Sequence, residues 1–456
     1  MAPMAPQAPA PQSHSAAPRA RRAASALATV ATAVVLAGAA APAAFADGAD
    51  GQQQKQQLPK GLYGSKDPQY DGVWRQSLAM LAQHTVGVRP AKSGVDWLAG
   101  QQCADGAFAA FRADPGKGCD AGTLRDTNQT AAAVQALAAL GGHGDAVGKA
   151  VRWLKSVQHE DGGWGSVPGG QGGEVSDANS TAVVIGALAA AGEKPESVTA
   201  KGGKGGKSPY DALLGFRLGC AAKDGERGAF TFQLKNAAPN ADATAAAVTG
   251  ALGKGFVVAP AAKDADRPVK ALDCAQGDKD GASGSGAKAR GAVADGGAGW
   301  LVGQLDAAGQ HLKSAMPGAE QQPDVGNTAD AVVALAAGGH GAAAQKPLGW
   351  LEKNAAGWAK QGGPAAYAQL IFAAHAAGAD PRSFGGTDLV SALNATGPAP
   401  AGSDAASPAA DQDAQDDATD AGGGGIGVWW VIGVGLAIGA GVGFLISGRN
   451  KSKTGL

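Results

Sequence analysis

Apolar and polar segments alternate along the middle of this chain. The apolar segments are rich in alanine on every side, and each opens at a residue that suits the start of a helix. They begin at Asp71, Asp126, Asp177, Asn240, Asp324 and Pro364. A helix that is apolar all round is buried all round, so we predict that these segments form inner helices.

More polar segments lie between them. They fall at 92–102, 146–158, 209–220, 298–313, 345–358 and 381–394. We predict that each forms an outer helix. Six inner and six outer helices in strict alternation predict an all-α fold, an α6/α6 toroid whose closure buries the terminal hairpins. Its interior is expected to be filled mostly by alanine methyl groups.

Four inner segments align on a threonine that is followed at once by Ala and, four residues on, by Val or Ile. These residues are Thr130, Thr181, Thr244 and Thr328. We expect them, like the Asp and Asn residues just before them, to cap free amide groups of the first turn.

A second motif ends two of the polar segments. WLAGQQCADGAF at 97–108 and WLKSVQHEDGGW at 153–164 share an aromatic–aliphatic pair, a Gln and a Gly-x-aromatic turn. The residues are Trp97, Gln102, Phe108, Trp153, Gln158 and Trp164. We expect a structural role, in which the rings wedge between helices and the Gln side chains satisfy backbone groups at helix ends.

These copies resemble the QW-type repeat of the prenyltransferase/squalene-cyclase superfamily. Phe216 to Phe230 and Trp300 to Gln304 are degenerate copies, so the resemblance covers about 58–397. It implies the α/α toroid that the superfamily shares. Its members include terpene cyclases, protein prenyltransferases, complement-type thioester domains and the larger domain of the cobalamin carriers.

The two ends predict an exported and anchored protein. Residues 1–46 have the arginines, apolar run and small residues of a signal peptide, and 47–57 form a linker. Residues 426–447 are uncharged and long enough to span a bilayer. The basic tail at 448–456 places the C-terminus in the cytoplasm and the bulk of the protein outside the cell.

Two further segments are expected to lack packed structure. The stretch at 398–425 is rich in Pro, Gly and Asp, which predicts a disordered acidic stalk. The stretch at 255–296 interrupts the repeat and is predicted to be a low-complexity insertion in the toroid.

The cysteines agree with export. An even number, Cys103, Cys119, Cys220 and Cys274, favours disulfides in an exported protein. They allow three pairings, of which Cys103–Cys119 with Cys220–Cys274 is the local one. The chain has no CxxC spacing, so we expect no zinc site.

Composition and motifs argue against the catalytic members of the superfamily. Terpene cyclases that protonate their substrate use a DxDD motif, which is missing here, since Asp324 and Asp330 are too far apart to form one. Aromatic residues make up only 5% of the chain, the inner segments lack cysteine, and no Cys-Gly-Glu-Gln occurs. We therefore expect no catalytic residues and no metal, although an enzyme is not excluded.

A repeated polar set marks the starts of the inner segments. It comprises Asp126, Asn128, Asp177, Asn179, Asn240, Asp242, Asp324 and Asn327. If the toroid closes, these residues meet at one mouth of the ring, where they would form a ligand-binding rim. Helix capping alone is the alternative interpretation.

Three functions follow from these expectations. The first is a membrane-anchored toroid at the cell surface that binds a ligand, with cobalamin as one option, or a protein partner. A cobalamin carrier would need a separate partner chain, because this chain has no small β domain. The others are a terpene cyclase or prenyltransferase and a structural envelope spacer. The net charge of −1 gives no indication of nucleic-acid binding. An aromatic-lined central cavity that holds an unpaired acid would favour the enzyme, and a shallow polar mouth would favour binding.

Overall fold

The computed structural model describes residues 58–170, 174–200, 206–235, 238–260, 266–275, 285–315 and 321–401. All of them fall in the second of the two units into which the chain divides. The regular secondary structure of this part of the chain is almost entirely helical, which confirms the all-α prediction. Its strands, Leu312–Lys313 (β1) and Pro323–Asp324 (β2), form one short antiparallel pair before an inner helix.

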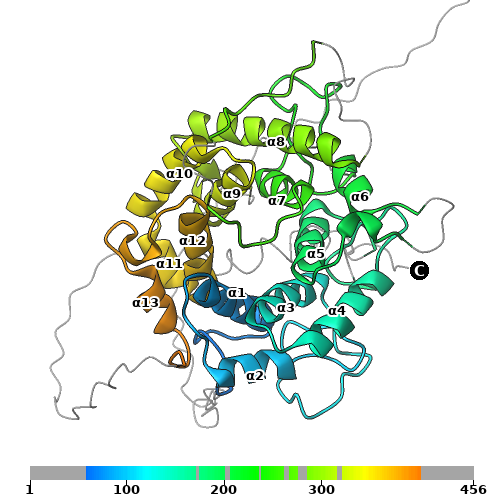
Figure 1. The fold of residues 1–456 in the computed structure, drawn as a ribbon, viewed down its shortest axis with the longest axis vertical. Coiled ribbons are helices and arrows are strands. Elements are labelled where there is room, and N and C mark those ends of the chain that lie inside the picture. Colours follow the sequence, from blue (N-terminus) through cyan, green and yellow to red (C-terminus); the bar gives the residue numbers. More distant parts are fainter. Residues whose placement is uncertain are drawn as a thin grey trace, which may run out of the picture. The chain divides into compact units, whose positions relative to one another are not determined.

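The apolar segments form the inner helices. They are α1 (Gly72–Thr85), α3 (Thr127–Leu140), α5 (Ala178–Ala190), α7 (Ala241–Ala251), α9 (Val325–Ala337) and α12 (Pro364–Ala376). Each packs against the next in this order, and α12 packs against α1 (Figure 1). These helices therefore form a closed cycle of neighbours.

The more polar helices lie outside this cycle (Figure 1). They are α2 (Lys92–Gly100), α4 (Gly144–Ser156), α6 (Pro209–Gly215), α8 (Ala287–Ala307), α10 (Gly341–Asn354), α11 (Ala356–Gly362) and α13 (Leu389–Asn394). The prediction of strict alternation was wrong at one place, because α10 and α11 follow each other between α9 and α12. Each packs on an inner helix, as α4 does on α3 and α8 does on α7. Two short 3₁₀ turns, η1 (Pro195–Ser197) and η3 (Pro381–Ser383), complete the elements.

Helix α8 departs from the prediction, because it begins inside the stretch assigned to an insertion. Ala289, Val293 and Gly297 are buried along it at intervals of four, which is the spacing of one helix face. Added to Gly297, a Cβ would lie 2.6 Å from a methyl of Val248 on α7. Gly297 thus permits close packing of α8 on α7.

Small side chains bring the inner helices close together. A Cβ added to Gly250 on α7 would lie 2.9 Å from the Cβ of Ala182 on α5. Along α3, every residue from Thr127 to Leu137 is buried. Most of the stabilisation of these helices therefore comes from apolar burial between neighbours.

The repeat turns are joined to the outer helices by side-chain hydrogen bonds. The Gln102 amide donates to the carbonyls of Gly106 (3.0 Å) and Ala146 (2.8 Å), and the Gln158 amide donates to Gly162 (2.8 Å). The indole N–H of buried Trp164 donates to the Leu154 carbonyl at 2.8 Å. These bonds fix the end of one outer helix to its own turn and to the next outer helix.

The glycines of these turns are required by their surroundings. Gly106 and Gly162 have φ of +99° and +91°, a region that favours glycine. A Cβ there would lie 2.3 Å from the Lys149 carbonyl oxygen and 2.2 Å from that of Ser208, respectively. Each turn therefore rests directly against the backbone of the next outer helix.

The aligned threonines have a role that differs from the predicted capping. The Thr130 hydroxyl accepts from the Phe108 backbone N–H (2.9 Å) and donates to the Asp126 carbonyl (2.6 Å). The other three hydroxyls accept in the same way from the turn before their helix. The pairs are Thr181 with Trp164, Thr244 with Phe230 and Thr328 with Leu312. The threonine thus ties the turn to the inner helix, while Asp or Asn caps it.

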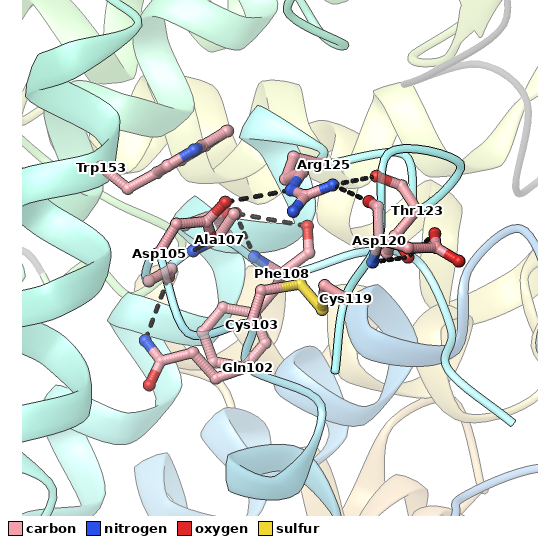
Figure 2. A network of polar contacts seen from close by, with 12 residues as sticks. Gln102, Cys103, Asp105, Ala107, Phe108, Cys119, Asp120, Thr123, Arg125 and Trp153 are labelled. Carbon is pink, nitrogen blue, oxygen red and sulfur yellow. Dashed lines mark hydrogen bonds and ion pairs between the residues drawn. A yellow bond between two sulfur atoms is a disulfide. The ribbon is translucent and has the colours of Figure 1, made fainter. Parts of the chain in front are cut away.

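The disulfides have the local pairing, Cys103–Cys119 and Cys220–Cys274. The first closes the loop between α2 and α3, where Arg125 donates to Asp105 at 3.0 Å and to the Thr123 carbonyl at 2.8 Å (Figure 2). The bonds indicate an oxidising compartment, in agreement with export.

Within the described ranges, no helix combines the length and the apolar character needed to cross a bilayer. The predicted signal peptide (1–46), linker (47–57), membrane span (426–447), basic tail (448–456) and most of the stalk lie outside those ranges.

Candidate functional site

Half of the predicted rim consists of helix caps. Asp126, Asp177, Asn240 and Asp324 precede α3, α5, α7 and α9. Their side-chain oxygens accept from the backbone N–H groups of Gln129 (2.9 Å), Ser180 (2.7 Å), Ala243 (2.8 Å) and Asn327 (3.0 Å), respectively. The side-chain oxygens of these four residues therefore cap the first turns of the helices.

The other half divides between the caps and the interior. The Asn327 amide donates to its cap residue Asp324 at 2.8 Å, and the Asn128 backbone N–H donates to Asp126 at 2.7 Å. Asn179 and Asp242 instead bond to each other across α5 and α7, with 2.6 Å between the Asn179 amide nitrogen and an Asp242 oxygen. Only this pair of the predicted set lines the central cavity.

The central cavity has a volume of about 90 Å³ and lies among the inner helices. Five of the inner helices contribute residues three or four positions apart, which lie on one face of a helix, and α3 contributes Gln135. On α5 and α7 these include Asn179, Ala182 and Val183, and Asp242, Ala245, Ala246 and Thr249. Among the described residues, the only alanines on this wall are Ala182, Ala245 and Ala246, so the expectation of an interior made mostly of methyl groups does not hold for the cavity.

A second carboxylate faces the same space. Asp330 on α9 lines the cavity, and the Gln369 amide on α12 donates to it at 3.3 Å. Asp242 and Asp330 are both partly exposed. No ion pair involves either residue in the ranges that the structure describes.

These carboxylates hold protons more tightly than usual. Burial raises the pKa of Asp242 to about 8, and the nearby Asp330 charge adds to the effect. Burial also raises the pKa of Asp330 to about 7, with a contribution from Asp324. The capping residues Asp126 and Asp177 have a pKa raised by burial to about 6. Near neutral pH, the cavity therefore contains carboxylic acids that can lose or gain a proton.

The segment after α7 passes across the ring and forms one wall of the cavity (Figure 1). The Phe256 ring lies edge-on to Trp74 of α1 (5.3 Å between centroids) and nearly parallel to Phe372 of α12 (6.4 Å). The Phe256 backbone N–H donates to the Gln135 side chain of α3 at 3.0 Å. This segment thus links α7 to the neighbouring helices α12, α1 and α3.

Glycines allow the segment to lie so deep. A Cβ on Gly186 of α5 would lie 2.7 Å from the Gly255 Cα, and a Cβ on Gly255 would lie 2.1 Å from a Gln135 oxygen. The two backbones meet without room for a methyl group. Since such contacts need glycine on both sides, the crossing belongs to the packed fold.

Several cavity residues were not identified from the sequence. Asp330 stands two residues after the aligned Thr328, where the other copies have Ala132, Val183 and Ala246. That departure from the repeat was a usable signal. Gln369 and Phe256 had none, because Gln369 lies in a helix without the threonine and Phe256 lies in the predicted insertion.

Within the described ranges, no cluster of three or more His, Cys, Asp or Glu side chains is suited to a metal ion.

Comparisons with known proteins identify neither a family nor an activity. No family model matches the chain, and no curated protein matches it. One similar solved structure is the crystal structure of a protein from Actinoplanes, with 15% identity and a TM-score of 0.44. The match covers 70% of this chain and 92% of that one.

Proposed function

We propose that this protein is an exported α6/α6 toroid, anchored to the cell membrane by 426–447, that binds a small molecule in its central cavity. The closed cycle of inner helices, the alternating outer helices and the QW-type turns support the toroid and its superfamily. The disulfides support export.

The observation that carries the binding function is the presence of Asp242 and Asp330 in the cavity. Burying a carboxylate away from cations lowers stability. A structural spacer has no need of Asp330, since the equivalent positions of the other copies are apolar: Ala132, Val183 and Ala246. Polar groups that lower stability at the centre of an apolar ring are typical of a site.

The size of the cavity limits the ligand. Pockets for drug-sized molecules have volumes of roughly 300–1,000 Å³, whereas this one has about 90 Å³. A corrinoid such as cobalamin does not fit inside, so the proposal is a smaller ligand. Asp242 and Asn179 are the rim residues assigned to it, and the caps are assigned to helix stability.

One feature favours an enzyme as a second candidate. Asp242 is protonated near neutral pH, and its cavity contains the rings of Trp74, Phe256 and Phe372. An acid beside aromatic rings suits protonation of an isoprenoid. The present volume does not admit such a chain unless Phe256 moves. Incubation with squalene and with geranylgeranyl diphosphate tests this candidate, which requires a cyclic product that Asp242→Asn fails to make.

A cavity-filling variant tests the binding function. The full-length protein and its Ala246→Leu variant are incubated with a metabolite extract and repurified, and bound small molecules are identified by mass spectrometry. We expect a compound to be released from the wild type and not from the variant, because residue 246 lines the cavity. Equal release from both proteins, or none from either, would reject the proposal.

Circular dichroism and thermal melting of both proteins serve as controls. An Ala246→Leu protein with a wild-type spectrum and cooperative melting is folded. Val183→Leu, which fills the cavity from α5, replaces it if it is not.

A further inference from the structure

The cavity wall has more free hydrogen-bond acceptors than free donors. Three side-chain donors on the wall are already used: the Asn179 amide on Asp242 (2.6 Å), the Gln369 amide on Asp330 (3.3 Å) and the Thr249 hydroxyl on its own helix (3.1 Å). Trp74 and Lys254, which also carry donors, line the cavity as well. The Gln135 amide points to the Val183 carbonyl at 3.4 Å. A ligand in this space therefore finds few free donors.

Acceptors, in contrast, remain. Asn179 is only 3% exposed, and its side-chain oxygen has no hydrogen-bond partner in the part of the chain that the structure describes. Only one oxygen of Asp242 receives a hydrogen bond from the described residues. A buried oxygen without a donor lowers stability, so a ligand that supplies a donor to Asn179 would be bound favourably here.

The negative charge around the cavity also favours a ligand that donates hydrogen bonds. The carboxylates of Asp242 and Asp330 lie close enough for each other's charge to matter, and Asp324 and Asp177 add to the negative field at Asp242. The nearest candidate cation is Lys254, which lines the cavity but is itself exposed. A cationic ligand would relieve this repulsion, and an anion would increase it.

The remaining wall is apolar and aromatic. Trp74, Leu78, Phe256 and Phe372 face the space that the carboxylates share. An alkyl chain can pack against such a surface, and aromatic faces attract a neighbouring cation. The site therefore combines an acidic, donor-poor end with an apolar end.

We propose that the cavity binds a small primary alkylammonium, whose N–H groups bond to Asp242, Asp330 and the Asn179 oxygen while its alkyl chain packs against Trp74 and Phe256. The three N–H donors of a primary ammonium match these three acceptors. This ligand class rests on the proposed binding function.

Titration of the full-length protein at about pH 8.5, where Asp242 is mostly ionised, tests the ligand class. The probes are butylammonium, butan-1-ol, butyrate and potassium, and the readout is the dissociation constant from calorimetry. We expect butylammonium to bind at least about tenfold more tightly than each other probe. Asp242→Asn and Asp330→Asn should each weaken it at least about tenfold, and Asp145→Asn, at an exposed site on α4, should not change it.

Other outcomes overturn the inference. Equal binding of butan-1-ol would show that charge is irrelevant, and preferential binding of potassium would indicate an inorganic cation site. Lack of binding by every probe would also reject it. If Ala246→Leu still abolishes release of some other compound from the metabolite extract, the binding function stands and only the ligand class fails.

Discussion

The turn between α2 and α3 and the central cavity contain similar polar residues, but these residues are hydrogen-bonded in the turn and partly without donors in the cavity. In the turn, Gln102 donates to two carbonyls, and Arg125 joins Asp105 to the backbone of its own loop (Figure 2). In the cavity, the Asn179 oxygen lacks a donor among the described residues, and the negative charge of Asp330 raises the pKa of Asp242.

This difference separates stability from function. A satisfied network stabilises the fold, and any change to it is expected to cost free energy. An unsatisfied set of acceptors lowers stability and is retained for another reason. Substitutions in the turns should therefore destabilise the protein, whereas neutralising substitutions in the cavity should stabilise it and remove binding.

The largest expected effect is at a repeat turn. Gly162→Ala should lower the free energy of unfolding by about 3–4 kcal/mol, because the new methyl group meets the Ser208 carbonyl at a backbone conformation that disfavours alanine. Urea denaturation measures the loss. Gly169→Ala is the control, since Gly169 also has a positive φ (+73°) but no atom within 4 Å of the added Cβ. It should lose only about 1 kcal/mol. Equal losses would show that the turn does not depend on close packing.

A second test compares two threonines on α7. Thr244→Val should lower the free energy of unfolding by about 2 kcal/mol, because the hydroxyl joins the Phe230 N–H (2.9 Å) to the Asn240 carbonyl (2.6 Å). Thr249 bonds only within its own helix, so Thr249→Val should change it by less than about 0.5 kcal/mol. Thermal unfolding monitored by circular dichroism measures both. A larger loss for Thr249→Val would contradict the division between turn and cavity.

The third test is a substitution in the cavity, which should raise the free energy of unfolding instead of lowering it. The pKa of Asp242 is raised from 3.8 to about 8 on folding. The stabilisation that comes from the protonated carboxyl is therefore fully present below the pKa of the unfolded chain, and it is lost as the pH rises through the pKa of the folded protein. The amide introduced by Asp242→Asn cannot ionise, and it can donate to the Asn179 oxygen. This variant should therefore be about 1–2 kcal/mol more stable than the wild type at about pH 9.

Urea denaturation from acidic to alkaline pH measures this gain. It should shrink toward acidic pH, where the wild-type carboxyl is protonated. Asp177, Asp324, Asp330 and Lys254 also face this region, so a residual pH dependence should persist in the variant. A variant that is less stable than the wild type at alkaline pH would show that the carboxylate is structural.

The smallest effect concerns Lys254. Its exposed ammonium lines the cavity and should repel a bound cation weakly through solvent. Lys254→Gln should therefore tighten butylammonium binding about twofold without changing the melting temperature. Weaker binding in calorimetry would show that Lys254 assists the ligand.

Local features were predictable because they depend on neighbours in the sequence. The starts of α3, α5, α7 and α9 follow from Asp or Asn caps, and the Gly-x-aromatic turns follow from the repeat. The prediction that the aligned threonines cap the helices was wrong, because their hydrogen-bond partners lie in the turn before the helix. Those partners, such as Phe108 for Thr130, become neighbours only when the helices pack.

The cavity was only partly predictable. Asn179 and Asp242 were singled out as rim residues, but Asp330, Gln369 and Phe256 were not assigned to the site. Asp330 is 88 positions from Asp242 in the chain, and only the packing of α9 beside α7 brings them together. The passage of Phe256 between Trp74 and Phe372 likewise depends on contacts with helices far apart in the sequence.

By itself, the sequence determined where the inner helices begin and that they are buried, because caps, turns and apolar composition act over a few residues. The tertiary structure decided which side of each inner helix faces the centre. An inner helix that is apolar all round has no polar face to indicate its orientation. Its rotation is set by packing against two neighbours and an outer helix, and that rotation turns Asp242, Asp330 and Asn179 toward one space.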